Sequence, residues 1–340
     1  MRVAGIAWRD EGYEVVVTND EELDDSELTA PTGYPGRRLA QLRQDLVDIG
    51  DLRCVVDSTS GALDGYLMAA GLTVYRADPW QLPERPAHGS ASARALAELG
   101  RRDPAALTRL RPEIGSLAGR AAEYLRHIAD CAGVEYELAR SGRLVVRAAG
   151  RRPEVALTFD DGPDPAFTPR VLDILREHGA RATFFLVGLN ANAHPELVER
   201  IVADGHGVGN HTWSHPYLPD LSRDEVLRQL DATGAAIATV TGEPPGLMRP
   251  PYGSRTPDVL RWIRGQQLTT VLWDIDVSDW AGPPAADIVA GVSAAAKAGS
   301  IVLMHDAGGD RTGTVTALPT ILADLAARGL RSVPVAELTR

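Results

Sequence analysis

The stretch EVALTFDDG, residues 154–162, decides how the second half of this 340-residue chain folds. Its largely apolar run from Val155 to Phe159 predicts a buried strand, and two carboxylates, Asp160 and Asp161, follow where the strand ends. Neighbouring strand residues face opposite sides, but a chain that turns at Gly162 brings both carboxylates to one cavity. Taken alone, the stretch also fits an ordinary acidic turn, because Asp and Gly are common in turns.

Short β-rich runs alternate with amphipathic helical stretches from residue 154 onward, which predicts consecutive βα units. Strands are expected to begin near Glu154, Ala182, Val208, Leu247, Thr269, Ile301 and Arg331. A capping box from Ser222 to Glu225 marks one helix start. This block is shorter than the ~250 residues of an eight-unit barrel, so we expect a smaller or incomplete βα barrel.

Four more polar clusters follow the paired acids. They are HTWSH at 211–215, RPPYG at 249–253, DVSDW at 276–280 and LMHD at 303–306. Most of them stand where a predicted strand gives way to its loop, which is where βα barrels gather catalytic side chains. One rim of the barrel is therefore expected to hold all the chemistry.

These clusters contain the residue types of a metal-dependent hydrolase. His211 and His215 can point at one ion if their segment is helical or tightly turned, and a carboxylate would complete a site open to water. Arg249 precedes two prolines that stiffen its backbone, although a plain proline turn would look the same. His305 closes an apolar strand and can donate a proton, and Asp279 either polarises it or is a loop acid.

Each of these residues also has an ordinary structural explanation, and Trp273 and Trp280 either wall a sugar-sized pocket or pack in the core. Five such explanations would have to hold at once, so the clusters together favour a hydrolase site. Residues 153 to 336 resemble the NodB-homology domain of the polysaccharide deacetylases, carbohydrate esterase family 4, whose five motifs occur here in order. The paired-acid, two-histidine and Arg-Pro-Pro-Tyr-Gly motifs are intact.

The resemblance implies a distorted βα barrel of about seven strands and the hydrolysis of N-acetyl groups from acetylated amino sugars, such as chitooligosaccharides or peptidoglycan-type glycans. It implies that Asp161, His211 and His215 bind the metal, usually Zn²⁺, with Co²⁺ or Ni²⁺ as alternatives. By the same resemblance, Asp160 is the general base held ionised by Arg249, and His305 is the general acid tuned by Asp279. The Tyr252 backbone N–H would stabilise the oxyanion, and Tyr252, Trp280 and Leu303 would contact the substrate.

The bulk properties limit the partners. The length favours two domains, an N-terminal α/β domain of unknown role at 1–150 and the NodB-like catalytic domain at 151–340. A net charge of −11 and a pI of about 5.2 disfavour nucleic acid and anionic membranes, so the expected partner is neutral or cationic. The resemblance implies that this partner is an acetylated glycan or a small acetylated sugar. Two cysteines are too few for a disulfide framework, and we expect both to be reduced.

The N-terminus reaches charged residues after a short run, with no apolar stretch long enough for a signal peptide or membrane span. The sequence therefore predicts a cytoplasmic protein, which puts a wall polymer in doubt as the substrate. A small non-polymeric acetamide, such as a natural product or an acetylated polyamine, is the alternative substrate. Protein partners are not predicted.

The first domain carries strand-like runs at Arg2–Trp8 and Tyr13–Thr18, an acidic run at Asp20–Asp25 and a helix near Gly36–Ile49. Strands at Cys54–Asp57 and Leu72–Tyr75 flank a helix from Ala62 to Ala70, which predicts a parallel pair. This order resembles a ribonuclease-H-like fold, but the first strand lacks the acid of a nuclease, and Asp57 is the one acid at a strand end. A docking role for this domain is the other alternative. Trp80 in the proline-rich stretch 79–86 could be exposed for such a role, although burial under a loop is favoured. A hairpin of Val134–Arg140 and Leu144–Arg147 is expected before the boundary.

Overall fold

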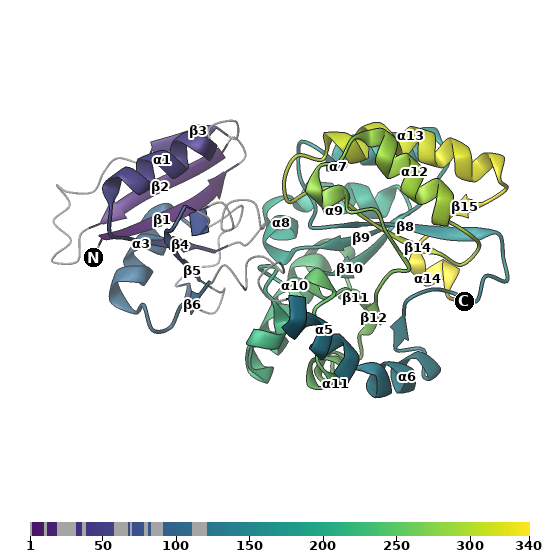
Figure 1. Ribbon diagram of the computed structural model, residues 1–340, viewed down its shortest axis with the longest axis horizontal. Coiled ribbons are helices and arrows are strands. Elements are labelled where there is room, and N and C mark those ends of the chain that lie inside the picture. Colours follow the sequence, from purple (N-terminus) through teal and green to yellow (C-terminus); the bar gives the residue numbers. More distant parts are fainter. Residues whose placement is uncertain are drawn as a thin grey trace. The chain divides into compact units, whose positions relative to one another are not determined.

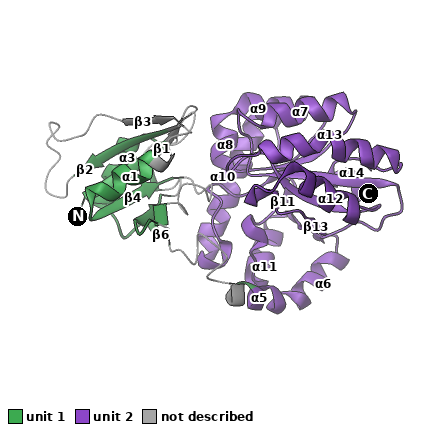
Figure 2. Cartoon of the chain, turned by 45° about the horizontal axis from the view of Figure 1, so that its top comes forward, with its two compact units in different colours: residues 1–124 green, residues 125–340 purple. Residues whose placement is uncertain are grey.

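The computed structural model describes residues 2–9, 12–18, 32–35, 39–57, 67–68, 70–77, 81–82, 91–110 and 121–340. The chain forms two compact units, residues 1–124 and 125–340, drawn in green and purple in Figure 2. The division lies upstream of the boundary expected near residue 150. The reason is that strand β7 (Leu144–Val145) pairs with β12 (Thr269–Val271) of the second unit.

A curled, parallel half-barrel sheet forms the centre of the second unit (Figure 1). Its strands run in the spatial order β13-β14-β8-β9-β10-β11-β12-β7, and β15 pairs with β8. Besides β7 and β12, they are β8 (Glu154–Asp160), β9 (Thr183–Leu186), β10 (Gly207–Asn210), β11 (Leu247–Met248), β13 (Ile275–Asp276), β14 (Ile301–His305) and β15 (Arg331–Ser332). Each of the seven expected strand starts lies at an observed strand or one residue from it, which confirms the incomplete βα barrel.

Helices and short 3₁₀ turns connect these strands. They are α5 (Ala121–Asp130), α6 (Ala132–Arg140), α7 (Thr168–Glu177), α8 (Gly188–Ala193), α9 (Pro195–Ala203), η4 (Leu218–Asp220), α10 (Arg223–Thr241), η5 (Pro251–Gly253), α11 (Pro257–Gly265), η6 (Asp279–Ala281), α12 (Ala285–Ala295), α13 (Thr312–Ala327) and α14 (Val335–Leu338). The predicted capping box starts α10, since the backbone N–H of Ser222 donates to Glu225 Oε2 at 2.7 Å and Ser222 Oγ accepts the Glu225 N–H at 3.4 Å.

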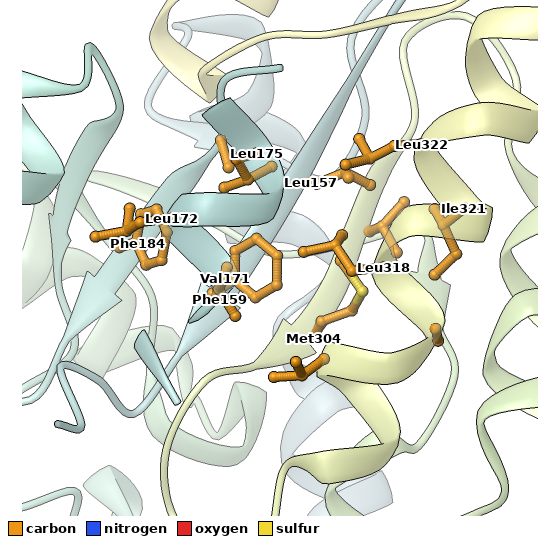
Figure 3. Packing of buried hydrophobic residues seen from close by; sticks show 14 of the residues in the cluster. Leu157, Phe159, Val171, Leu172, Leu175, Phe184, Met304, Leu318, Ile321 and Leu322 are labelled. Carbon is orange, nitrogen blue, oxygen red and sulfur yellow. The ribbon is translucent and has the colours of Figure 1, made fainter. Parts of the chain in front are cut away.

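The core of the second unit packs β8 between helices, and Figure 3 shows part of it. Leu157 and Phe159 project from one face of β8 toward side chains of α7 and α13, whereas Ala156 lies in a separate cluster on the other side. Burial on both faces explains why the sequence of β8 is apolar throughout rather than alternating. Each large apolar side chain buried this way contributes about 1.5–3 kcal/mol. The packing therefore gives Asp160, at the end of β8, a rigid base.

The first unit contains a six-stranded sheet in the order β3-β2-β1-β4-β5-β6. Its elements are β1 (Arg2–Arg9), β2 (Gly12–Thr18), β3 (Thr32–Pro35), α1 (Leu39–Ile49), β4 (Leu52–Val56), β5 (Thr73–Arg76), α3 (Ala93–Arg102) and β6 (Thr108–Arg109). The two strand-like runs form the antiparallel pair β1–β2, and the expected parallel pair β4–β5 is present. The parallel pairing of β1 with β4 and the strands β3 and β6 were not expected. Gly5 lets α3 approach β1 closely, because a Cβ there would lie 1.9 Å from the Ala93 carbonyl oxygen. The ribonuclease-H-like assignment stays a prediction.

The expected hairpin at 134–147 is wrong. Residues 132–140 form helix α6, and β7 pairs in parallel with β12 instead of turning back on a neighbour. Val134 and Leu138 are four residues apart, a spacing that fits one face of a helix as well as one face of a strand, and both are buried in the helix.

Several predicted features lie outside the described residues: the acidic run Asp20–Asp25, Trp80, most of the Ala62–Ala70 helix, and the 79–86 stretch apart from residues 81 and 82. Cys54 and Cys131 are both buried and unbonded, as expected. None of the helices in the described ranges has the length and apolar character needed to cross a bilayer.

Candidate metal centre and active site

The paired acids stand at the carboxyl end of β8. Asp160 is the last residue of the strand, and Asp161 has a φ of 75° in the left-handed region. The chain therefore turns at Asp161 itself, one residue before the expected turn at Gly162, and this turn changes the direction of the second carboxylate relative to the strand. The Asn190 side-chain amide donates to the Asp161 carbonyl oxygen at 2.7 Å and helps to hold this uncommon conformation.

The two histidines lie in the loop after β10. Their segment is tightly turned rather than helical, and His215 has a φ of 56°. Gln229, buried in α10, holds the loop, because its Oε1 accepts the backbone N–H groups of Trp213 and Ser214 at 2.8 and 2.9 Å. The tight turn brings the two imidazole rings to a centroid distance of 4.9 Å.

Asp161, His211 and His215 converge as the sequence predicts. Each offers one ligand atom, and these atoms lie within 4.8 Å of one another. Asp161 Oδ1 is 3.4 Å from His211 Nε2 and 3.2 Å from His215 Nε2, and it has no hydrogen-bond donor among the described residues. His211 Nδ1 donates to the Arg249 carbonyl oxygen at 2.7 Å, which leaves its Nε2 lone pair for a ligand.

Charge and chemistry also suit a cation at this cluster. Burial by itself would raise the pKa of Asp161, but His215 and His211 beside it hold that pKa well below its usual range. The carboxylate is therefore ionised and ready to bind a positive ion. Two imidazole nitrogens and one carboxylate oxygen with open positions form a donor set that divalent transition metals accept.

Arg249 orients Asp160. Its guanidinium is fully buried and donates from Nη1 to Asp160 Oδ1 at 2.6 Å and to Thr158 Oγ1 at 2.7 Å. It also donates to two backbone carbonyls of residues 271 and 272, and it packs over Phe185, 4.2 Å from the ring centroid. Asp160 Oδ2 lies 3.7 Å from His211 Nε2. This carboxylate therefore has one oxygen fixed and the other beside the metal cluster.

Replacing Arg249 with methionine is expected to lower the free energy of unfolding by about 3–5 kcal/mol, because the Asp160 carboxylate would stay buried without its partner. Urea denaturation of the full chain measures this change. Arg261→Met is the matched control, since Arg261 and Asp258 form an exposed pair whose loss should change stability by less than about 1 kcal/mol. Equal stability of the two variants would contradict the role given to Arg249.

Asp279 and His305 form a second buried pair. His305 Nδ1 donates to Asp279 Oδ1 at 2.7 Å, and Asp279 Oδ2 accepts the His305 backbone N–H at 2.9 Å and the Thr314 hydroxyl at 2.7 Å. Burial would lower the pKa of His305, but the hydrogen bond and charge of Asp279, with the nearby acids Asp161 and Asp160, raise it to about 9. With no cation bound nearby, the imidazole is therefore held in its protonated form at neutral pH, the form that can donate a proton.

The strand register places Asp160 of the Asp160–Arg249 pair and His305 of the Asp279–His305 pair on neighbouring strands. His305 stands opposite Asp160 and Leu303 stands opposite Thr158 in the β14–β8 ladder, so all four share one face of the sheet. Leu303 is buried, whereas Trp280 in η6 is 57% exposed. The Tyr252 ring packs edge-on against His215 with a centroid distance of 4.6 Å. Trp273 packs against Arg249, with the guanidinium carbon 5.5 Å from its ring centroid.

Two buried residues of this rim had no role in the sequence analysis. Asp306 follows His305, and the Thr168 hydroxyl donates to its Oδ2 at 2.5 Å. Burial raises the pKa of Asp306 to about 7, even though the hydrogen bond from Thr168 opposes the shift. Its place in the LMHD cluster indicated that Asp306 lies near the site. The sequence does not show that Asp306 faces Gly162, where a Cβ would lie 2.5 Å from Asp306 Oδ1.

Arg311 is the second of these residues. Its buried guanidinium donates to the carbonyl oxygens of Ala307 at 2.6 Å, Gly308 at 2.7 Å and Trp280 at 3.2 Å. It therefore ties the loop after His305 to the turn that carries Asp279 and Trp280. No sequence signal distinguishes it from the exposed arginines of the chain.

The first unit shows no comparable cluster among its described residues. Asp57 is buried and accepts the Ala91 backbone N–H at 2.5 Å, and β1 contains no acidic residue. The nuclease alternative thus gains no support.

Comparisons with known proteins agree with this geometry. The family model for polysaccharide deacetylase matches residues 147–271. A peptidoglycan-N-acetylglucosamine deacetylase of Bacillus cereus is 41% identical over 206 residues, which cover 60% of this chain and 96% of that protein. The chain belongs to the polysaccharide deacetylase family.

Two further relatives agree with this membership. A chitooligosaccharide deacetylase of Sinorhizobium fredii is 42% identical over 205 residues, covering 56% of this chain and 95% of the relative. The crystal structure of the Bc1960 peptidoglycan N-acetylglucosamine deacetylase superposes with a TM-score of 0.58 at 38% identity, covering 60% of this chain and 96% of that one. The residues matched by the family model lie within the second unit and begin after α6.

Proposed function

We propose that this polysaccharide deacetylase hydrolyses the N-acetyl groups of acetylated amino sugars, in chitooligosaccharides or peptidoglycan-type glycans, to acetate and a free amine. One observation carries the proposal: Asp160 and His305 end adjacent strands beside the predicted metal cluster. Arg249 holds the first of them and Asp279 holds the second. The names of the relatives, peptidoglycan-N-acetylglucosamine and chitooligosaccharide deacetylases, support the same substrate class.

Asp161, His211 and His215 would hold the metal, for which we propose Zn²⁺, with Co²⁺ or Ni²⁺ as alternatives. When bound, such an ion polarises the acetamide carbonyl and lowers the pKa of water. Asp160 takes one proton from the water as its oxygen adds to the carbonyl carbon, and Arg249 keeps the carboxylate in place for this transfer.

The leaving amine and the oxyanion need separate groups. His305 donates its Nε2 proton to the sugar nitrogen as the carbon–nitrogen bond breaks, because its Nδ1 proton is held by Asp279. The backbone N–H of Tyr252 donates to the oxygen that becomes negative in the tetrahedral intermediate. Leu303 and Trp280 would contact the acetyl methyl and the sugar. The net charge of −11 is compatible with a neutral glycan whose product is cationic.

Removal of the metal by a chelator is expected to abolish acetate release and to lower the melting temperature, because Asp161 would again be buried beside two histidines without its cation. Added Zn²⁺ should restore both properties in the wild type. His211→Ala should bind Zn²⁺ more weakly, by calorimetry, and should stay inactive. His178→Ala is the matched control, because His178 is exposed at the end of α7 and should respond like the wild type. Full activity of the metal-free protein would reject the site.

The substrate class is tested by acetate release from acetylated glucosamine oligomers, peptidoglycan fragments and an acetylated polyamine, each with the Zn²⁺-loaded full chain. We expect release from the amino-sugar substrates. Release confined to the polyamine would reject the glycan and favour the small-acetamide alternative.

A further inference from the structure

The Tyr252 loop has a backbone conformation that needs support from outside. Tyr252 and Gly253 are consecutive residues in the left-handed region, with φ of 60° and 63°. This conformation is unfavourable for tyrosine and persists only where the surrounding structure holds it. Two hydrogen bonds of 2.9 Å close the turn, from the Gly253 N–H to the Pro250 carbonyl and from the Ser254 N–H to the Pro251 carbonyl.

Arg255 supplies the support from just after the loop. Its Nη1 donates to the Gly253 carbonyl oxygen at 2.6 Å, and its Nε donates to Glu135 Oε1 on α6 at 2.5 Å. Arg255 is 9% exposed, so both of these hydrogen bonds lie in a largely buried environment. Glu135 thereby fixes the direction from which Arg255 holds Gly253, and charge-assisted bonds of this kind are the stronger ones.

Helix α5 reaches the same loop indirectly, through Tyr217. His127 Nδ1 is hydrogen-bonded to the Tyr217 hydroxyl at 3.3 Å, and the two rings stack. Tyr217 is buried, its ring centroid lies 6.5 Å from that of Tyr252, and Tyr252 in turn packs on His215. Figure 1 shows α5 and α6 beside α11, the helix that follows Arg255.

These two helices precede residue 147, where the match to the family model begins. We propose that Glu135 is a positioning residue for catalysis, acting through Arg255 to hold the Tyr252 backbone N–H toward the developing oxyanion. The proposal rests on the proposed function, because that function gives the Tyr252 N–H its role. It makes α6, which precedes the residues matched by the family model, a support of the active site.

Glu135→Gln tests the proposal, because it replaces the charge-assisted bond from Arg255 with a weaker neutral one. Glu137→Gln is the matched control, since Glu137 is exposed on the same helix. We expect Glu135→Gln to speed hydrogen exchange in a peptide covering residues 251–255 and to lower kcat for acetylated glucosamine oligomers by about tenfold or more, with KM within about twofold. Removal of a whole oxyanion donor costs about 10²–10³ in kcat, and a misdirected donor costs part of that. Glu137→Gln should change neither readout.

A double variant tests whether Glu135 and Arg255 affect kcat together or independently. If Glu135 acts through Arg255, Glu135→Gln combined with Arg255→Lys should lose no more kcat than the more damaged single variant. Should Glu135→Gln fail to fold by thermal melting, Arg255→Lys carries the test alone, because lysine keeps the charge but cannot donate to two partners in the guanidinium geometry.

An unchanged kcat in folded Glu135→Gln overturns the proposal, whether or not exchange rises, because the pair would then be structural only. A wild type that releases no acetate would reject the proposed function instead. Hydrogen exchange then tests whether α6 positions the Tyr252 loop. Faster exchange of residues 251–255 in Glu135→Gln supports this positioning, and unchanged exchange overturns it.

Discussion

Asp160→Asn is expected to lower kcat for acetate release by about 10³, within the range of 10²–10⁴ that general acid–base catalysis contributes. Asparagine keeps the size of the side chain and an oxygen that can accept the Arg249 hydrogen bond, but its amide cannot take the proton of the attacking water. Metal affinity should therefore stay close to that of the wild type, whereas the melting temperature should fall, because the buried Arg249 guanidinium loses its charged partner. Single-turnover acetate release with each Zn²⁺-loaded protein measures the effect.

Asp258→Asn is the control for Asp160→Asn, because Asp258 pairs with Arg261 on the surface of α11 and should have no effect on kcat. Retention of more than a tenth of the wild-type activity by metal-loaded Asp160→Asn would mean that another group is the base.

His305→Gln is expected to lower kcat for the amide by about 10²–10⁴, because the amine would leave without a donated proton. An activated ester such as 4-nitrophenyl acetate has a leaving group that departs without protonation, so its hydrolysis should fall much less. His178→Gln, an exposed substitution on α7, should alter neither reaction. Equal losses on the amide and the ester would contradict the role of His305 as the acid.

The pH profile gives a second readout for His305. Its protonated form is the active one, so kcat/KM should fall as the pH rises through its pKa, which the structure raises to about 9. A bound cation would repel the imidazolium and move this limb to lower pH. The limb should be absent from His305→Gln, and its persistence there would assign the titration to another group.

Seven strands of the second unit could be placed from the sequence, and two of them, β11 and β15, have only two residues each. A strand was also expected at the position of β7, but its parallel pairing with β12 was not, and β13 was missed. The residues of α6 fit two periodicities equally well, and packing of Val134 and Leu138 selects the helix. Sequence patterns thus locate most of the strands, whereas pairing partners and the choice between helix and strand depend on contacts in the fold.

The same distinction holds in the site. Asp160, Asp161, His211 and His305 stand in recognisable clusters at strand ends, so their positions could be predicted. The bond from Glu135 to Arg255 spans 120 positions of the chain, and that from Asn190 to Asp161 starts from a residue with no distinguishing pattern. Residues that act by holding another residue are defined by the fold, and only the structure identifies them.

The most direct test of the account is to quantify acetate and new glucosamine amines released from acetylated glucosamine oligomers by the Zn²⁺-loaded full chain, with Asp160→Asn in parallel. We expect equal amounts of acetate and amine from the wild type and almost none of either from Asp160→Asn. A folded, metal-loaded wild type that releases neither product from these oligomers would contradict it.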